Sequence, residues 1–280
     1  MSEMLRCLDH AADTGAADGS EIQQMYDDKL DAVIMREALP VEAVAVAAGA
    51  VGAEGATDAW ARPNRPVPII DLRLLGMGAA PCATMPTGPA EDEYLDAAEQ
   101  TPAAIRGLFG EGLDPFTAIE ERFKQLAGCP ADVPRTGASR PFSPCTVRAI
   151  PAGAGLMVHH DNHYQLPVYD GVRGQIDTSA LLSFFVVLGR PAAGGRLCVF
   201  GRGPQDDPDL PFLDSGLPDP EGFFREVPHQ YFDLGPGDLI VFASSRLYHT
   251  VERVQGASPR VTMGGFMGLN PAHSKLLYWS

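Results

Sequence analysis

The stretch from Leu239 to Leu269 reads LIVFASSRLYHTVERVQGASPRVTMGGFMGL and decides the fold class. It contains three short runs of β-branched, aromatic and other apolar residues, which serine, glycine and proline separate. Runs of this composition, bounded by turn residues, predict strands at 239–243, 248–254 and 260–269. Three strands in such close succession indicate an all-β architecture for this part of the chain.

The same pattern of short apolar runs separated by turn residues extends upstream to about residue 141. Further strands are predicted at 145–150, 156–160, 180–188, 196–200, 231–234 and 276–279. An array of about eight strands is what a closed barrel or jelly roll requires. A long insert at 201–228, rich in proline and aspartate, interrupts the array. A loop of this length serves either as an active-site lid or as a surface excursion.

Up to about residue 130 the sequence predicts helices instead. Ser20 to Gln23 has the form of a capping box, and apolar residues follow at helical spacing to about Leu39, which predicts one amphipathic helix. Two more helices are predicted at 41–53 and 91–109. A fourth begins at Asp114-Pro115, where aspartate caps the helix and proline takes its first position.

The helical pattern of the first part and the strand pattern of the second predict one catalytic domain over residues 1–280. In it, a helical part, residues 1–135, packs on a β core, residues 140–280, and the insert 201–228 is a possible lid. The fold class expected is mainly β with a helical flank, as a double-stranded β-helix of the jelly-roll or cupin-like kind.

Charge and cysteine content exclude several classes of protein. The net charge of −15 repels phosphate backbones and anionic lipid surfaces, so neither nucleic acid nor membrane is an expected partner. The five cysteines are scattered, which offers neither a disulfide framework nor a CxxC zinc site. No apolar segment is long enough to cross a bilayer, and the N-terminus lacks the apolar core of a signal peptide. We therefore expect a cytoplasmic protein.

A cluster of histidines carries the chemistry. Three of the seven histidines fall within VHHDNH, residues 158–163. On an extended backbone, His159 and Asp161 share a face and can bind one cation. His249 lies inside a predicted strand, 88 residues after Asp161. Two imidazoles and one carboxylate are the ligand set of non-haem iron oxygenases, which leave the other coordination positions open.

Arg260 and Thr262 add a second functional pair. Arg260 follows His249 by 11 residues, on the next predicted strand, and Thr262 shares its face. Together they offer a guanidinium fork and a hydroxyl to one carboxylate. This arrangement can anchor the distal carboxylate of 2-oxoglutarate while its keto-acid end chelates iron.

In these residues the chain resembles the iron(II)- and 2-oxoglutarate-dependent dioxygenases. Their pattern is H-x-D, a distal histidine, and R-x-S or R-x-T about ten residues later. The segments 183–197 and 234–251 are similar to the prolyl-hydroxylase-like branch of that superfamily. In its size, its helical N-terminal part and its ending Tyr-Trp-Ser, the chain resembles the members of that branch that act on small molecules. These are the hydroxylases of N-acylated amino acids and the related alkaloid halogenases.

The resemblance implies a metal site at His159, Asp161 and His249 and a cosubstrate anchor at Arg260 and Thr262. Iron(II), 2-oxoglutarate and dioxygen are the implied cofactors, with succinate and carbon dioxide as by-products. Halogenating relatives replace the carboxylate by glycine or alanine to make room for chloride. Because Asp161 is present, we expect hydroxylation of an unactivated C–H bond in a small amino-acid-like or natural-product substrate.

Several alternatives stay open. His160 or His163 becomes the first ligand if the strand ends early, and otherwise both are substrate contacts or solvated neighbours. Candidate substrate contacts are His163, Arg148 and Phe224. The same site could carry out desaturation, epimerisation or cyclisation. A cupin-like metal enzyme or a binding barrel without 2-oxoglutarate is a further reading, although it leaves Arg260 and Thr262 unexplained. The sequence does not indicate an oligomeric state.

Overall fold

Two β-sheets form the core of the computed structural model, which describes residues 5–11, 17–52, 69–71, 91–137, 139–161, 169–205, 210–213 and 218–280. The smaller sheet has the order β6 (Leu156–His159), β11 (His249–Val251), β8 (Leu197–Phe200) and β9 (His229–Phe232). The larger sheet follows the path β1 (Cys7–His10), β2 (Ala32–Met35), β10 (Leu239–Phe242), β7 (Leu182–Gly189), β12 (Arg260–Leu269), β13 (Leu276–Trp279) and β4 (Ala131–Asp132). Beside this path, β5 (Thr146–Ile150) pairs with β12, and β3 (Ile69–Asp71) pairs with β5.

Strand β12 organises the larger sheet. One of its edges pairs with β5 in its first half and with β13 in its second, while the other edge pairs with β7. Gly264 and Gly265 lie where the backbones are closest, since a Cβ on Gly264 would sit 2.3 Å from the Phe184 carbonyl oxygen. A side chain would clash there with a neighbouring strand, so the glycine pair permits this packing.

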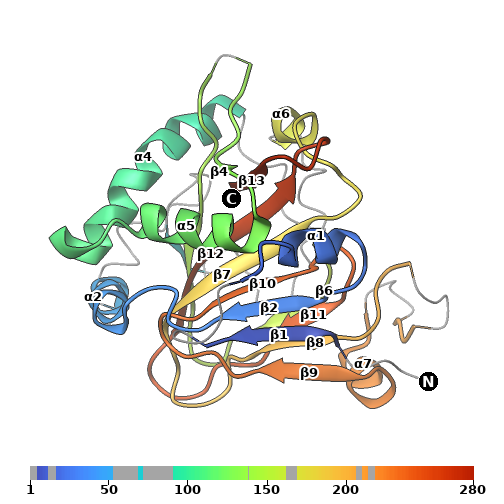
Figure 1. Cartoon of the computed structure of the whole chain (residues 1–280). Coiled ribbons are helices and arrows are strands. Elements are labelled where there is room, and N and C mark those ends of the chain that lie inside the picture. The colour runs from blue at the N-terminus through green and yellow to red at the C-terminus, as the bar shows by residue number, and fades with distance from the viewer. Residues whose placement is uncertain are drawn as a thin grey trace.

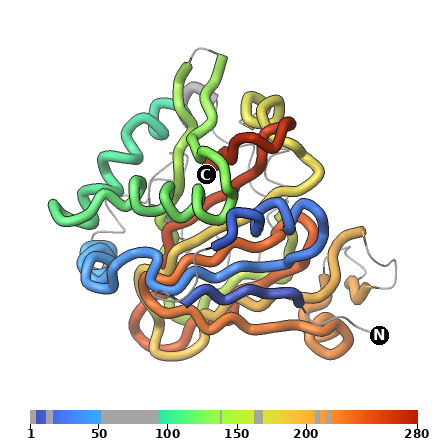
Figure 2. Tube along the Cα trace, in the orientation of Figure 1, coloured from blue at the N-terminus to red at the C-terminus, as the bar shows by residue number. Residues whose placement is uncertain are grey.

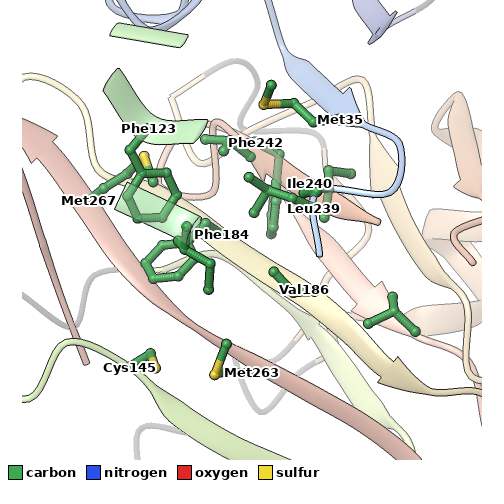
Figure 3. Packing of buried hydrophobic residues seen from close by; sticks show 14 of the residues in the cluster. Met35, Phe123, Cys145, Phe184, Val186, Leu239, Ile240, Phe242, Met263 and Met267 are labelled. Atoms are coloured by element: carbon green, nitrogen blue, oxygen red, sulfur yellow. The ribbon is translucent and has the colours of Figure 1, made fainter. Parts of the chain in front are cut away.

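Three helices pack on the outer side of the larger sheet (Figures 1 and 2): α2 (Val41–Gly52), α4 (Glu91–Phe109) and α5 (Pro115–Ala127). The ring of Phe123 on α5 lies 4.8 Å from that of Phe184 on β7, and Figure 3 shows both beside Met267. The predicted start of α5 is confirmed, because Asp114 accepts a hydrogen bond from the Phe116 N–H with proline at the first helical position.

The predicted helix that continues to Leu39 is wrong. Helix α1 (Glu21–Tyr26) is short, and Ala32–Met35 forms β2, whose four residues are all buried between β1 and β10. A short apolar run fits a buried strand as well as a helix, so periodicity alone did not separate the two. The capping box is also wrong, because the Ser20 hydroxyl donates to Asp18 rather than to the helix backbone.

The strand predictions from residue 145 onward are confirmed, with the strand expected at 231–234 shifted to 229–232. The fold is therefore mainly β with helices on one side, as expected. The N-terminal part also supplies β1 and β2 to the larger sheet. Two short helices, α6 (Asp170–Arg173) and α7 (Pro220–Glu226), and one 3-10 turn, η2 (Gly110–Gly112), complete the described elements. No helix in the described ranges has the length and apolarity of a membrane span.

Candidate metal and cosubstrate site

The structure brings His159, Asp161 and His249 together. One ligand atom from each residue lies within 4.8 Å of the other two. His159 and His249 are direct partners in the antiparallel pairing of β6 with β11, and their ring centroids are 4.2 Å apart. This pairing explains how residues far apart in the sequence form one site.

Backbone hydrogen bonds orient both imidazoles. Nδ1 of His159 lies 2.7 Å from the Met157 carbonyl oxygen, and Nδ1 of His249 lies 3.2 Å from that of Leu247. When Nδ1 carries the hydrogen and donates it to the carbonyl, Nε2 keeps its lone pair. The Nε2 atoms lie 3.9 Å and 3.7 Å from the Asp161 carboxylate, so the three donors converge on one point. Such hydrogen bonds are typical of metal-binding histidines.

Asp161 is fixed from both sheets. It follows β6 in the smaller sheet, and its backbone N–H donates to the Ser244 carbonyl oxygen at 2.9 Å. From β7 in the larger sheet, the Ser183 hydroxyl donates to Oδ2 at 2.5 Å. Sequence reasoning did not assign this role to Ser183. A single hydroxyl within the apolar run LLSFFVVL was the signal that could have revealed it.

The environment keeps His249 neutral. It is 4% exposed, and the ring of Phe242 on β10 lies 5.0 Å from the imidazole. Burial, with a smaller contribution from the charge of His159, lowers the pKa of His249 to about 3. A neutral imidazole with an available lone pair is the form that binds a metal ion.

Arg260 and Thr262 lie together on β12, as predicted. Both are buried, and the guanidinium donates to the Thr262 hydroxyl at 3.4 Å. The guanidinium also stacks over Phe185, 4.8 Å from the ring centroid. Burial, aided by the positive charge of Arg148, lowers the pKa of Arg260 to about 10. Within the described ranges no carboxylate forms an ion pair with Arg260. Because a buried unpaired charge costs free energy, the binding of an anionic ligand at Arg260 would be favourable.

A cavity adjoins the Arg260 side chain. Its apolar wall consists of residues from both sheets and the turns that join them: Val187, Leu197, Phe232 and Leu234. The lining also includes Arg190 and Arg196, so three guanidinium groups border the cavity. This combination suits one end of a small dicarboxylate.

The other candidate residues occupy different places. Arg148 lies on β5, directly opposite Thr262 of β12. Phe224 is not brought to the metal site, because it packs with Phe200 and Tyr231 in the apolar cluster on the outer face of the smaller sheet. His160 lies edge-on to Tyr248, at 5.4 Å between ring centroids. His163 falls outside the described residues.

The donor set fits iron(II) and 2-oxoglutarate. Two neutral imidazoles and one carboxylate are the ligands expected for a non-haem iron oxygenase, and they leave positions for a bidentate cosubstrate and dioxygen. The buried Arg260 with Thr262 matches the distal carboxylate of the cosubstrate. The residues present therefore suit both ends of 2-oxoglutarate: the metal ligands for its keto-acid end, through the ion, and Arg260 with Thr262 for its distal carboxylate.

One solved structure supports the fold, and a second is a more distant likeness. An N-substituted L-amino acid dioxygenase from Burkholderia ambifaria AMMD, in complex with alpha-KG, is similar to the chain at 16% identity and a TM-score of 0.50. The match covers 92% of this chain and 90% of that one. A prolyl-4-hydroxylase from Pseudomonas putida has 16% identity and a TM-score of 0.37, over 94% of each chain. No curated protein sequence matches the chain.

The family assignment comes from the sequence as a whole. The family model described as carrier-protein-independent halogenase WelO5 matches residues 5–280, which is nearly the entire chain. It includes the metal ligands and Arg260 in one continuous match. The chain therefore belongs to the carrier-protein-independent halogenase WelO5 family and is a 2-oxoglutarate-dependent non-haem iron dioxygenase.

Proposed function

We propose that this enzyme hydroxylates an unactivated C–H bond of a small amino-acid-like or natural-product substrate. The observation that carries the proposal is the carboxylate of Asp161, which is 5% exposed and lies with both histidines. A halogenating site has glycine or alanine at this position, so that chloride can bind the metal. Here the carboxylate fills that place, which favours transfer of a hydroxyl group.

Each residue has a distinct part in this proposal. His159, Asp161 and His249 hold the metal, and the Ser183 hydroxyl fixes one oxygen of the Asp161 carboxylate. Arg260 and Thr262 bind the distal carboxylate of 2-oxoglutarate. Iron(II) bound at the triad, together with 2-oxoglutarate and dioxygen, would supply the oxidising chemistry, with succinate and carbon dioxide as by-products.

The insert at 201–228 stays a possible lid. Its described part packs on the outer face of the smaller sheet through Phe223, which is fully buried, and the ring of Phe212 lies 6.3 Å from that of Tyr248. Because Tyr248 precedes the metal ligand His249, movement of the insert would reach the site through this contact. The cytoplasmic location also stays a prediction.

Product analysis tests the proposed outcome. The iron-loaded enzyme is supplied with 2-oxoglutarate, dioxygen, chloride and a panel of small amino-acid-like molecules, and the products are analysed by mass spectrometry. We expect a product that has gained one oxygen atom, formed together with succinate. A chlorinated product, a product that has lost two hydrogens, or an epimer would contradict hydroxylation while leaving the cofactor assignment in place.

A further inference from the structure

Arg148 is a positive charge in the interior that the metal and cosubstrate site does not require. It lies on β5, where Val147 and Ala149 belong to the main apolar core. Because side chains alternate along a strand, Arg148 faces the opposite way, into the space between the sheets. Its direct partner on β12 is Thr262, whose hydroxyl accepts the hydrogen bond from Arg260. The two arginines are therefore neighbours in the site.

Most of the other arginines in the described ranges form ion pairs. Nine of the fifteen arginines that the structure describes form ion pairs with carboxylates, in a protein with a net charge of −15. Arg148 and Arg260 form none within the described ranges, although partial or complete burial makes an unpaired charge costly. Each also repels the other, and this contributes to the lowered pKa of Arg260. Two such cations side by side indicate that more than one anionic group binds here.

The charges at the proposed site balance without Arg148. Iron(II) and Arg260 bring three positive charges, and Asp161 and the two carboxylates of 2-oxoglutarate bring three negative charges. Arg148 leaves one partly buried positive charge without a counterpart in this sum. One additional carboxylate, bound bidentately by the guanidinium, would neutralise it.

We propose that Arg148 binds a carboxylate of the primary substrate, so that the enzyme acts on a small organic acid rather than on a neutral or cationic molecule. This inference rests on the proposed function, because it places the acid beside the 2-oxoglutarate site. The carboxylate holds the substrate at the β5 side of the interior. The same contact lets the enzyme discriminate between acids and uncharged molecules, because a substrate without the negative charge leaves Arg148 unpaired.

The test compares Arg148→Gln with Arg148→Lys, which keeps the charge, and with Arg253→Gln. Arg253 is exposed and forms no carboxylate ion pair in the described ranges, so its variant removes an equal charge elsewhere. Probes are aliphatic carboxylic acids and α-amino acids of increasing size, each paired with its primary carboxamide. Binding is measured anaerobically on protein loaded with iron(II) and 2-oxoglutarate, as a change in the visible band of the chelate.

We expect the wild-type protein to bind at least one acid about tenfold more tightly than its amide. Arg148→Gln should lose about 10- to 100-fold in affinity for that acid, but less than about threefold for its amide and for 2-oxoglutarate. Arg148→Lys should retain part of the preference for the acid, because it keeps the charge but not the bidentate fork. Arg253→Gln should bind like the wild type.

Two results would overturn the inference. In one, no acid in the panel binds better than its amide. In the other, Arg148→Gln weakens 2-oxoglutarate binding as strongly as Arg260→Gln does, which makes Arg148 a second cosubstrate ligand. Failure of the proposed function looks different, because the product would then be chlorinated, desaturated or epimerised while the wild-type protein still binds the acid more tightly than its amide.

Discussion

Oγ of Ser183, on the larger sheet, donates a 2.5 Å hydrogen bond to Oδ2 of Asp161, which follows a strand of the smaller sheet. Both residues are buried, at 7% and 5% exposure. The bond connects the two sheets at the metal site and restricts the rotation of the carboxylate. Oδ1 of the same carboxylate lies 3.9 Å from Nε2 of His159.

Replacing Ser183 with alanine should weaken metal binding. Without the hydroxyl the carboxylate is free to rotate, and loss of such outer contacts lowers metal affinity by about 10- to 100-fold in known sites. Anaerobic titration with iron(II), followed by the change in protein stability, measures the affinity. Ser179→Ala, which changes an exposed serine before the same strand, is the control. Unchanged iron affinity in Ser183→Ala would show that the bond has no role in holding the ligand.

Replacing Asp161 with alanine should reduce hydroxylation by at least about 100-fold, because the metal loses the carboxylate ligand that the described residues supply. Asp161→Glu is the informative control, since it keeps the charge and displaces it by one methylene group. Its activity should fall between those of the wild type and Asp161→Ala. Oxygenated product and succinate are quantified together. A hydroxylation rate that Asp161→Ala leaves intact would identify another residue as the ligand.

Arg260→Met should stabilise the protein while abolishing cosubstrate binding. Burial lowers the pKa of Arg260 to about 10, so at every pH below that value the side chain is charged and its burial costs free energy of folding. The apolar side chain removes this cost, and we expect the melting temperature without ligands to rise by about 2–4 °C. Thermal unfolding without and with 2-oxoglutarate and iron(II) measures both effects. A lower melting temperature without ligands would show that the stacking on Phe185 and the bond to Thr262 outweigh the cost of burial.

Asp31 should stabilise the segment that leads to His249. It accepts hydrogen bonds from the backbone and side chain of Arg6 and pairs with Arg246 at 3.0 Å. Burial raises the pKa of Asp31, but the contacts with Arg6 and Arg246 hold it below its ordinary value. The contribution is therefore complete above the unfolded pKa of about 3.9 and is lost as the pH falls through the lower folded pKa.

Asp31→Asn should consequently lower the free energy of unfolding at neutral pH by about 2 kcal/mol. It should also make the loss of stability below about pH 4 shallower than in the wild type. Denaturant unfolding at several pH values measures both quantities. Asp27→Asn, at an exposed carboxylate on the same turn, should change little. If the stability of Asp31→Asn fell with decreasing pH as steeply as that of the wild type, other carboxylates would be responsible for the loss of stability in acid.

Much of the site could be predicted from the sequence, because its geometry follows from strand alternation. The H-x-D pair and the R-x-T pair each place two side chains on one face of a strand, and both pairs lie together as expected. The number of residues between Asp161 and His249 does not by itself predict that these two side chains meet. The resemblance to known oxygenases supplied that link, and the direct pairing of His159 with His249 explains it.

Other features depended on tertiary contacts that the sequence does not reveal. Val33 and Ile34 fit a helix by spacing, but their neighbours β1 and β10 make them a strand. The role of Ser183 depends on a residue from the opposite sheet. Phe224 was placed near the substrate because it lies in the insert, yet α7 turns it toward the outer face of the smaller sheet.

Anaerobic titration of the purified protein with iron(II) and 2-oxoglutarate tests the central claim most directly. We predict a weak visible charge-transfer band that requires both additions, with saturation at one equivalent of each. Arg260→Gln should shift the 2-oxoglutarate titration to concentrations about 10- to 100-fold higher, while leaving iron(II) affinity within about threefold of the wild type. Absence of the band from the wild-type protein, or equal losses of affinity for iron(II) and 2-oxoglutarate in Arg260→Gln, would contradict the account.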